Sequence, residues 1–172
     1  MRSKYSAYDI ATWFIWKNSI EQTNNEIDEE QYEVYEGLSH LKVQKLLYYA
    51  QGVSLAANGV PLFDEKIVAW PHGPVVKEVY KEFEKFGRTD IPESEILDNI
   101  DNIQIIANDI ATSEILDIVY ENFGGYTAWQ LREKTHEKGA PWQTVVDTKG
   151  MGKVISNEMI RRYFIDHIVE NG

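Results

Sequence analysis

Residues 40–57, HLKVQKLLYYAQGVSLAA, decide the fold of this chain. Apolar residues recur there at the three- and four-residue spacing of a helix, and others widen the apolar surface. Ser39 precedes the stretch as a candidate N-cap, and Asn58-Gly59 follows it as a helix end. The spaced residues are Val43, Leu46, Leu47, Ala50, Val53 and Ala57, with Leu41, Tyr49 and Leu55 beside them. A helix that is apolar over most of its circumference contacts several neighbours, so we predict a central helix here.

Shorter amphipathic stretches flank this central helix on both sides. We expect helices from Ser6 to about residue 22, from Pro74 to Gly87, from about residue 112 to Phe123, from Thr127 towards His136, and after Ser156. Residues 60–73 and 139–142 are typical of loops, with at most a short two-stranded β element. Residues 88–109 are polar, with Pro92 as a breaker and a small apolar run at 103–106. The predicted fold class is mainly α, a single compact bundle of five to six helices around the central one. Residues 1–37 would form an N-terminal helix and acidic arm, packed on or flanking a helical domain at 38–172.

Composition and charge limit the classes of function. The 172 residues include no cysteine, which excludes disulfides, thiolate metal sites and a thiol nucleophile. With 17 Lys and Arg against 28 Asp and Glu, the net charge is −11, so nucleic acid would be repelled and is a disfavoured partner. No apolar run approaches the roughly 18 residues of a membrane span. We therefore expect a cytoplasmic protein that does not bind a membrane.

A search for catalytic chemistry rests on four histidines, His40, His72, His136 and His167. They do not pair at metal-ligand spacing, and the sequence has neither a Gly-rich phosphate loop nor a nucleophile elbow. We expect no metal, no cofactor and no catalytic residue, because an isolated histidine more often hydrogen-bonds to nearby backbone. A small hydrolase that uses His72 or His136 stays as an alternative.

Three segments carry a family resemblance. They are LSHLKVQKLLYYAQG at residues 38–52, WPHGPVVKEVY at 70–80 and LREKTHEKGAPW at 131–142. In order and approximate spacing they are similar to L-K-L-Q-K-L-L-Y-Y-A-Q, W-x-x-G-P-V-V-x-x-V-Y and L-x-x-x-T-H-x-x-G-S-P-W of the Panacea-domain antitoxins, also called SocA-like or phage-associated GepA-like proteins. Val43, Lys77 and Ala140 stand where that pattern usually has Leu, Pro and Ser.

The resemblance implies a function in protein binding. A Panacea-like domain at 38–172 would be an antitoxin that neutralises a cognate toxin by direct contact, with the toxin encoded by an adjacent gene or within a prophage. It does not imply an enzymatic site, and it leaves a homodimer open. An alternative is an acidic phage-type inhibitor that mimics nucleic acid through the acidic segment 21–36.

The motif residues divide into a candidate binding set and a scaffold set. Gln44, Tyr48 and Gln51 share one helical stripe with Lys45 beside it, so they could form a recognition face. In a second interpretation, which we favour, Tyr48 and Gln51 are buried and hold the Trp70–Pro74 turn, because buried polar groups need partners. The candidate partner-binding residues are Gln44, Lys45, Tyr48, Gln51, His72 and Lys77. The scaffold residues are Trp70, Gly73, Pro74, Tyr80, Thr135, His136, Pro141 and Trp142, with Trp142 as the plug of a loop folded on the core.

Overall fold

The computed structural model describes residues 2–26 and 37–169. Within these residues the chain is mainly helical, as predicted, with eight α-helices and one small sheet. The α-helices are α1 (Ala7–Glu26), α2 (His40–Asn58), α3 (Lys77–Phe83), α4 (Ile100–Asn108), α5 (Ile110–Phe123), α6 (Ala128–Thr135), α7 (Pro141–Lys149) and α8 (Asn157–Phe164). The strands are β1 (Ile67–Trp70), β2 (Gly73–Val76) and β3 (Val154–Ile155). Short 3₁₀ turns at Glu84–Phe86 and Glu93–Asn99 and a π-turn at Ile165–Val169 complete the described elements.

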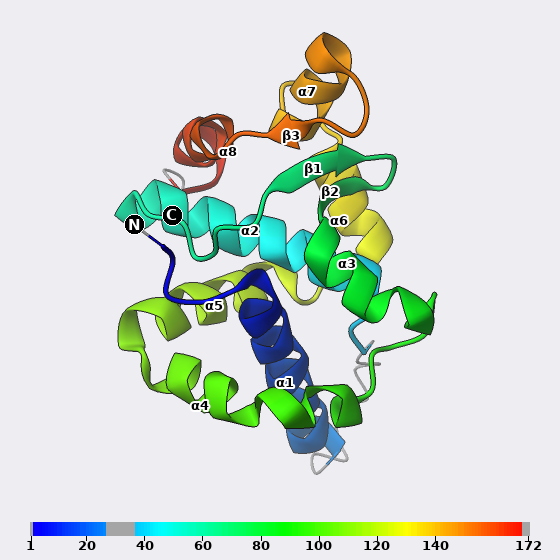
Figure 1. Cartoon of the computed structure of the whole chain (residues 1–172), viewed down its shortest axis with the longest axis vertical. Coiled ribbons are helices and arrows are strands. Elements are labelled where there is room, and N and C mark those ends of the chain that lie inside the picture. The colour runs from blue at the N-terminus through cyan, green and yellow to red at the C-terminus, as the bar shows by residue number, and fades with distance from the viewer. Residues whose placement is uncertain (1, 27–36, 170–172) are drawn as a thin grey trace.

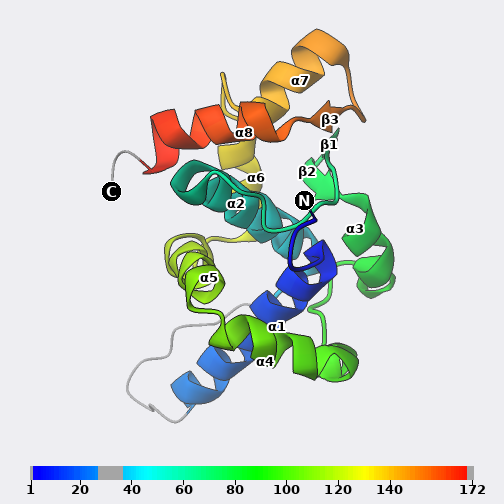
Figure 2. The same cartoon turned by 60° about the vertical axis from the view of Figure 1, so that its left-hand side comes forward.

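Helix α2 is the centre of the molecule, as its apolar spacing predicts. Figure 1 shows it crossing the middle, with α7, α8 and the sheet on one side and α1, α4 and α5 on the other. Figure 2 shows α8 lying along α2 and α1 crossing beneath it. The Ser39 hydroxyl accepts a hydrogen bond from the Lys42 N–H at 3.3 Å, and Gly59 ends the helix with φ 71°. Both cap predictions are therefore confirmed.

Two glutamines on α2 hold the segments that follow it. The Gln51 side chain accepts from the Leu62 N–H at 2.7 Å and donates to the Phe63 carbonyl at 2.9 Å. The Gln44 side chain accepts from the Val76 N–H at 2.8 Å and donates to the Val76 carbonyl at 3.4 Å. Each amide thus pairs with backbone that would otherwise be buried without a partner. Gln51 holds the 62–63 loop, so the predicted tie from Gln51 to the Trp70–Pro74 turn was wrong.

The sheet has three strands rather than two, in the order β2-β1-β3, and both pairings are antiparallel. Ala69 of β1 pairs with Pro74 of β2, so Pro74 lies in a strand and not at the start of a helix. An edge strand tolerates proline because the missing N–H removes no ladder bond on its open side. Helix α3 begins three residues later, at Lys77.

The helix count exceeds the predicted five to six, because helices form in a polar segment that was assigned no element and at a segment expected to be a loop. Residues 88–109 hold a 3₁₀ turn and α4, whose Ile103 and Ile106 are buried. Residues 139–142 lead directly into α7, where Pro141 occupies the first turn. Proline is favoured there because its missing N–H would have had no helical partner.

The N-terminal helix belongs to the same core. Ser6 and Asp9 form the predicted reciprocal cap, with Asp9 N–H donating to the Ser6 hydroxyl at 3.1 Å and Ser6 N–H to the Asp9 carboxylate at 3.0 Å. Trp13 and Phe14 are buried against the central cluster. Most of the acidic segment 21–36 lies outside the described residues. No helix in the described ranges is long and apolar enough to span a membrane.

Gly52 sets the approach of α8 to α2. A Cβ added at Gly52 would clash with the aromatic ring of Phe164 on α8, because it would lie closer to three ring carbons than van der Waals contact allows. We expect Gly52→Ala to lower the free energy of unfolding by about 1–3 kcal/mol, because overpacking a tight core outweighs the gain of about 1 kcal/mol in helix propensity. Urea unfolding followed by circular dichroism measures this. Gly125→Ala is the matched control, since a Cβ there meets no atom within 4 Å; an equal loss in both variants would contradict the prediction.

Trp142 plugs the space between α6 and the β1–β2 hairpin. Its ring stacks on His136 with centroids 3.6 Å apart, and its Nε1–H donates to the Trp70 carbonyl at 2.8 Å. We expect Trp142→Ala to cost about 3–5 kcal/mol of stability. Trp142→Phe keeps an aromatic ring but loses the hydrogen bond, so its loss should be smaller, about 1–3 kcal/mol. Thermal and urea unfolding of the pair test this, and an alanine variant as stable as the parent chain would refute it.

Candidate functional site

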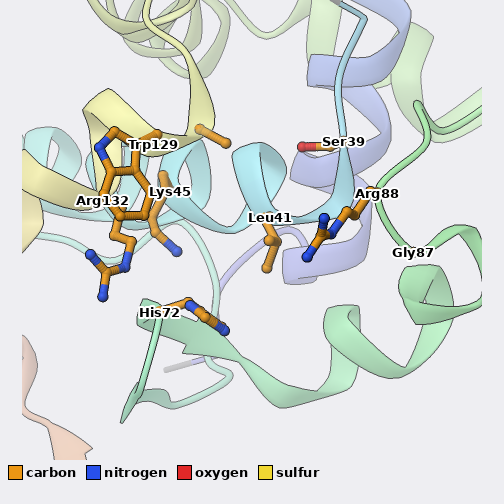
Figure 3. Close-up of a pocket in the computed structure, with 9 residues that line it drawn as sticks. Ser39, Leu41, Lys45, His72, Gly87, Arg88, Trp129 and Arg132 are labelled. Atoms are coloured by element: carbon orange, nitrogen blue, oxygen red, sulfur yellow. The ribbon is translucent and has the colours of Figure 1, made fainter.

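A cavity of about 310 Å³ opens between the N-terminal half of α2, the face of α6 and the β1–β2 turn. We call it the α2–α6 pocket. Its lining residues are Ser39, Leu41, Lys45, His72, Gly87, Arg88, Ala128, Trp129 and Arg132. Figure 3 shows Lys45, Trp129 and Arg132 on one side, Arg88 on the other, and His72 below. The opening is therefore lined by one lysine, two arginines and one histidine, although the chain as a whole has a net charge of −11.

Lys45 is the unusual member of this group. The residue is 1% exposed, and its Nζ has no hydrogen-bond partner among the described residues. Burial, and after it the nearby positive charge of Arg132, lowers the pKa of Lys45 to about 7. A buried ammonium group lowers the stability of the fold unless it is paired with an opposite charge. Buried groups with strongly shifted pKa values are found most often at functional sites.

Gly73 makes room for the Lys45 side chain. A Cβ at Gly73 would lie 2.9 Å from Cε and 3.1 Å from Nζ of Lys45, and the φ of Gly73 is +119°. Two reasons therefore favour glycine at position 73: the backbone of the turn is left-handed, and the lysine side chain approaches it closely. This turn supports the prediction that Gly73 is a scaffold residue and adds its role beside Lys45.

Arg132 and Trp129 form one wall of the pocket, one helical turn apart on α6. The Arg132 guanidinium lies 4.8 Å from the centre of the Trp129 ring, and Trp129 is 65% exposed. The Arg132 Nε is buried without a hydrogen-bond partner in the described chain, while its NH1 donates to the Glu133 carboxylate at 3.3 Å. Thr127 caps α6 with Gln130 in a capping box, and the resulting helix turns Trp129 outward.

His136 lies behind the wall rather than in the opening. Its ring stacks on Trp142, and its Nε2 is buried without a partner among the described residues. Burial first, then the charges of Arg132, Lys45 and His72, lowers the pKa of His136 to about 4. The imidazole is therefore neutral near pH 7, and its lowered pKa reflects the same positive potential that acts on Lys45.

The structure separates the candidate binding residues into two groups. Lys45 and His72 line the pocket, and Lys77 is exposed at the start of α3, outside the lining residues. Gln44, Tyr48 and Gln51 are buried, at 1%, 2% and 0% exposure, so their stripe is no open recognition face in this chain. Tyr48 packs edge-on to the rings of Tyr49 and Phe164.

The scaffold residues surround the pocket from behind. Trp70 packs edge-on to Tyr80 with centroids 4.9 Å apart, and its carbonyl accepts from Trp142. Thr135 is buried and donates its hydroxyl to the Arg132 carbonyl at 2.9 Å. The hydrogen bond from Trp142 links α7 to β1, and that of Thr135 lies within α6.

Sequence reasoning did not place Leu41, Arg88, Trp129 and Arg132 in the site. Arg88 comes from the loop after α3, and Arg132 from a helix far along the chain, so only the tertiary fold brings them together. The available signal was the Thr127 cap, which fixes the phase of α6 and sets Trp129 and Arg132 three residues apart on one face.

The pocket chemistry favours binding of an anion. The Ser39 hydroxyl is engaged as the cap of α2, so it accepts from the Lys42 N–H. Within the described ranges no group of three or more His, Asp or Glu side chains is arranged to hold a metal ion. What the lining offers is a buried amine, a guanidinium with unused donors and an exposed indole.

Comparison with known proteins identifies the family. The family model described as "Antitoxin SocA-like, Panacea domain" matches residues 43–143, which include most of α2, the β1–β2 hairpin and α6. The chain is 31% identical over 135 residues to Antitoxin SocA of Caulobacter vibrioides (strain NA1000 / CB15N), and the match covers 74% of this chain and 72% of that protein. No solved structure matches the chain. The chain therefore belongs to the SocA-like antitoxin family with a Panacea domain.

Proposed function

We propose that the protein neutralises a partner toxin by direct contact and that the toxin docks over the α2–α6 pocket. Membership of the antitoxin family supports the first part. The second part rests on one observation, the buried and unpartnered Lys45 ammonium at the floor of an open cavity. A contact with a partner would give this group the pairing that the described chain does not supply.

The composition of the pocket mouth also suits a protein partner. Trp and Arg are among the residue types most enriched at the hot spots of protein interfaces, and here an Arg lies over an exposed Trp. Trp129 offers a large rigid surface that loses little conformational entropy on binding. Burying it against a partner would remove apolar surface from water.

We also propose that this role is one of binding and not of turnover. His136 is stacked on Trp142 behind the pocket wall, and the hydroxyl that lines the pocket, that of Ser39, serves as a helix cap. These contacts support a scaffold role for both groups. A cytoplasmic location, a toxin gene next to this one, a prophage origin and a homodimer stay predictions.

Co-expression with the product of the adjacent reading frame tests the function. We expect that product to arrest growth alone, and co-expression of this chain to restore growth, with the two proteins recovered as a complex by affinity pull-down. A product that does not affect growth, or that does not bind, would contradict the antitoxin proposal.

Trp129→Ala tests the location of the contact. Because Trp129 is 65% exposed, the substitution should leave stability nearly unchanged while weakening toxin binding by about 2 kcal/mol or more. Ile110→Ala is the matched control, since Ile110 is 72% exposed on α5 and outside the pocket lining. Titration calorimetry against the toxin measures both. Equal affinity of the Trp129 variant and the parent chain would remove the pocket from the interface.

A further inference from the structure

We propose that the α2–α6 pocket binds a carboxylate of the protein partner, presented next to an apolar side chain, with Lys45 and Arg132 as donors and Trp129 as the apolar wall. This inference rests on the proposed function for its partner and specifies the chemistry of the contact. It names the group that the toxin must present, either an Asp or Glu side chain or the chain terminus.

The first observation is a buried cationic side chain that has no hydrogen-bond partner among the described residues. Lys45 is 1% exposed, with its Nζ unpartnered in the described chain, and its side chain reaches the cavity. No Asp or Glu is among the residues that line the cavity. A buried charge of this kind is stabilised by a hydrogen-bonded ion of opposite sign, and an anion entering through the opening would supply one.

Arg132 supplies the second donor. Its Nε is buried and unpartnered within the described residues, and its plane lies against Trp129 with 4.8 Å to the ring centre. Among the described residues its ionic contact is with Glu133, whose side chain is 59% exposed, so that pair contributes little to stability. In Figure 3 the Arg132 and Lys45 side chains both point downward on the left, with His72 below them and Arg88 on the opposite side of the opening. A guanidinium fork beside an ammonium matches the two oxygens of a carboxylate.

The surroundings favour a carboxylate over a polyphosphate or nucleic acid. Leu41, Ala128 and Trp129 give the opening an apolar wall, which suits a small anionic head on an apolar body. A volume of about 310 Å³ accommodates one or two side chains. The net charge of −11 repels an extended polyanion, whereas a single carboxylate is held by the local cations before that repulsion matters.

Proton uptake should accompany this binding. Burial and the charge of Arg132 hold the pKa of Lys45 at about 7 in the free protein, whereas a carboxylate at Nζ favours the charged form and raises that pKa. Affinity is then highest where free Lys45 already carries its proton, below about pH 7, and it falls as the pH rises above that value. The other groups facing Lys45 are Arg132, which keeps its charge, and the imidazoles of His40, His72 and His136.

Nuclear magnetic resonance on the full, ¹⁵N-labelled chain tests the chemistry without any toxin. The probes are N-acetyl-leucine for a terminal carboxylate, acetyl-leucyl-glutamyl-amide for a side-chain carboxylate, N-acetyl-leucinamide as the uncharged match, and inorganic phosphate. We expect at least one carboxylate probe to shift the Trp129 indole and Arg132 Nε–H signals at millimolar concentration, the amide to leave them unchanged, and phosphate to bind more weakly. Equal shifts with the amide, or tighter binding of phosphate, would overturn the proposal.

Substitutions assign the effect to the two donors. Lys45→Met and Arg132→Gln should each weaken the carboxylate probe by about tenfold or more, since hydrogen bonds to charged groups are lost. Lys134→Met, on α6 but outside the pocket lining, is the matched control and should bind as the parent does. The Lys45→Met variant should unfold at a higher urea concentration than the parent near pH 6, because it removes a penalised ammonium. If Lys45→Met is more stable than the parent chain, its weaker binding of the probe is not caused by misfolding.

The pH profile separates this role from a structural one. Between about pH 6 and pH 9 the parent chain should lose about tenfold or more in affinity for the probe, and Lys45→Met should lose much less, because only the imidazoles near the pocket still change charge in that range. A flat profile in the parent would refute the role of Lys45. Failed growth rescue with intact carboxylate selectivity would dismiss the antitoxin proposal alone, and rescue without any carboxylate selectivity would dismiss this inference alone.

Discussion

The burial of α2 on almost every side is the constraint on which the rest of the structure depends. A helix in that position must satisfy each of its polar side chains internally, because water does not reach them. Gln44 and Gln51 meet this requirement by pairing with the backbone of Val76 and of the 62–63 loop. These pairs also decide where the hairpin lies, so the requirement of α2 sets the position of β2 and of the turn that faces Lys45.

Lys45 is subject to the same constraint but is not satisfied. Its neighbours could have closed around it, yet Gly73 leaves space at Nζ and α6 stands back to leave a cavity. A local feature that costs stability while the surrounding elements agree with one another is typical of a functional position. The layer of Trp70, Tyr80, Thr135 and Trp142 packs behind the cavity.

The sequence predicted the parts of the fold that depend on local spacing. The caps at Ser39 and Gly59 and the reciprocal Ser6–Asp9 cap are short-range patterns, and all of them form. Pro74 was misplaced because proline suits both a helix start and an edge strand, and only the pairing with Ala69 decides between them. In the site, Lys45 and His72 were found from motifs. The spacing of residues does not predict which way the Gln44–Gln51 stripe faces. Nor does it predict that Arg88 and Trp129 line the pocket, because both outcomes depend on tertiary contacts.

Pairing of Lys45 links the binding of a partner to the stability of the fold. In the free protein, burial of the ammonium lowers the stability of the native state at and below neutral pH, because the unfolded chain holds that proton without penalty. A carboxylate at Nζ removes the penalty, so in the proposed complex the antitoxin gains stability from the same contact that masks the toxin. In the proposed complex the lysine therefore favours the bound state, because the ion pair offsets a burial cost that the free protein carries. A hydrophobic residue at this position would give a more stable free chain and a weaker link between folding and capture of the partner.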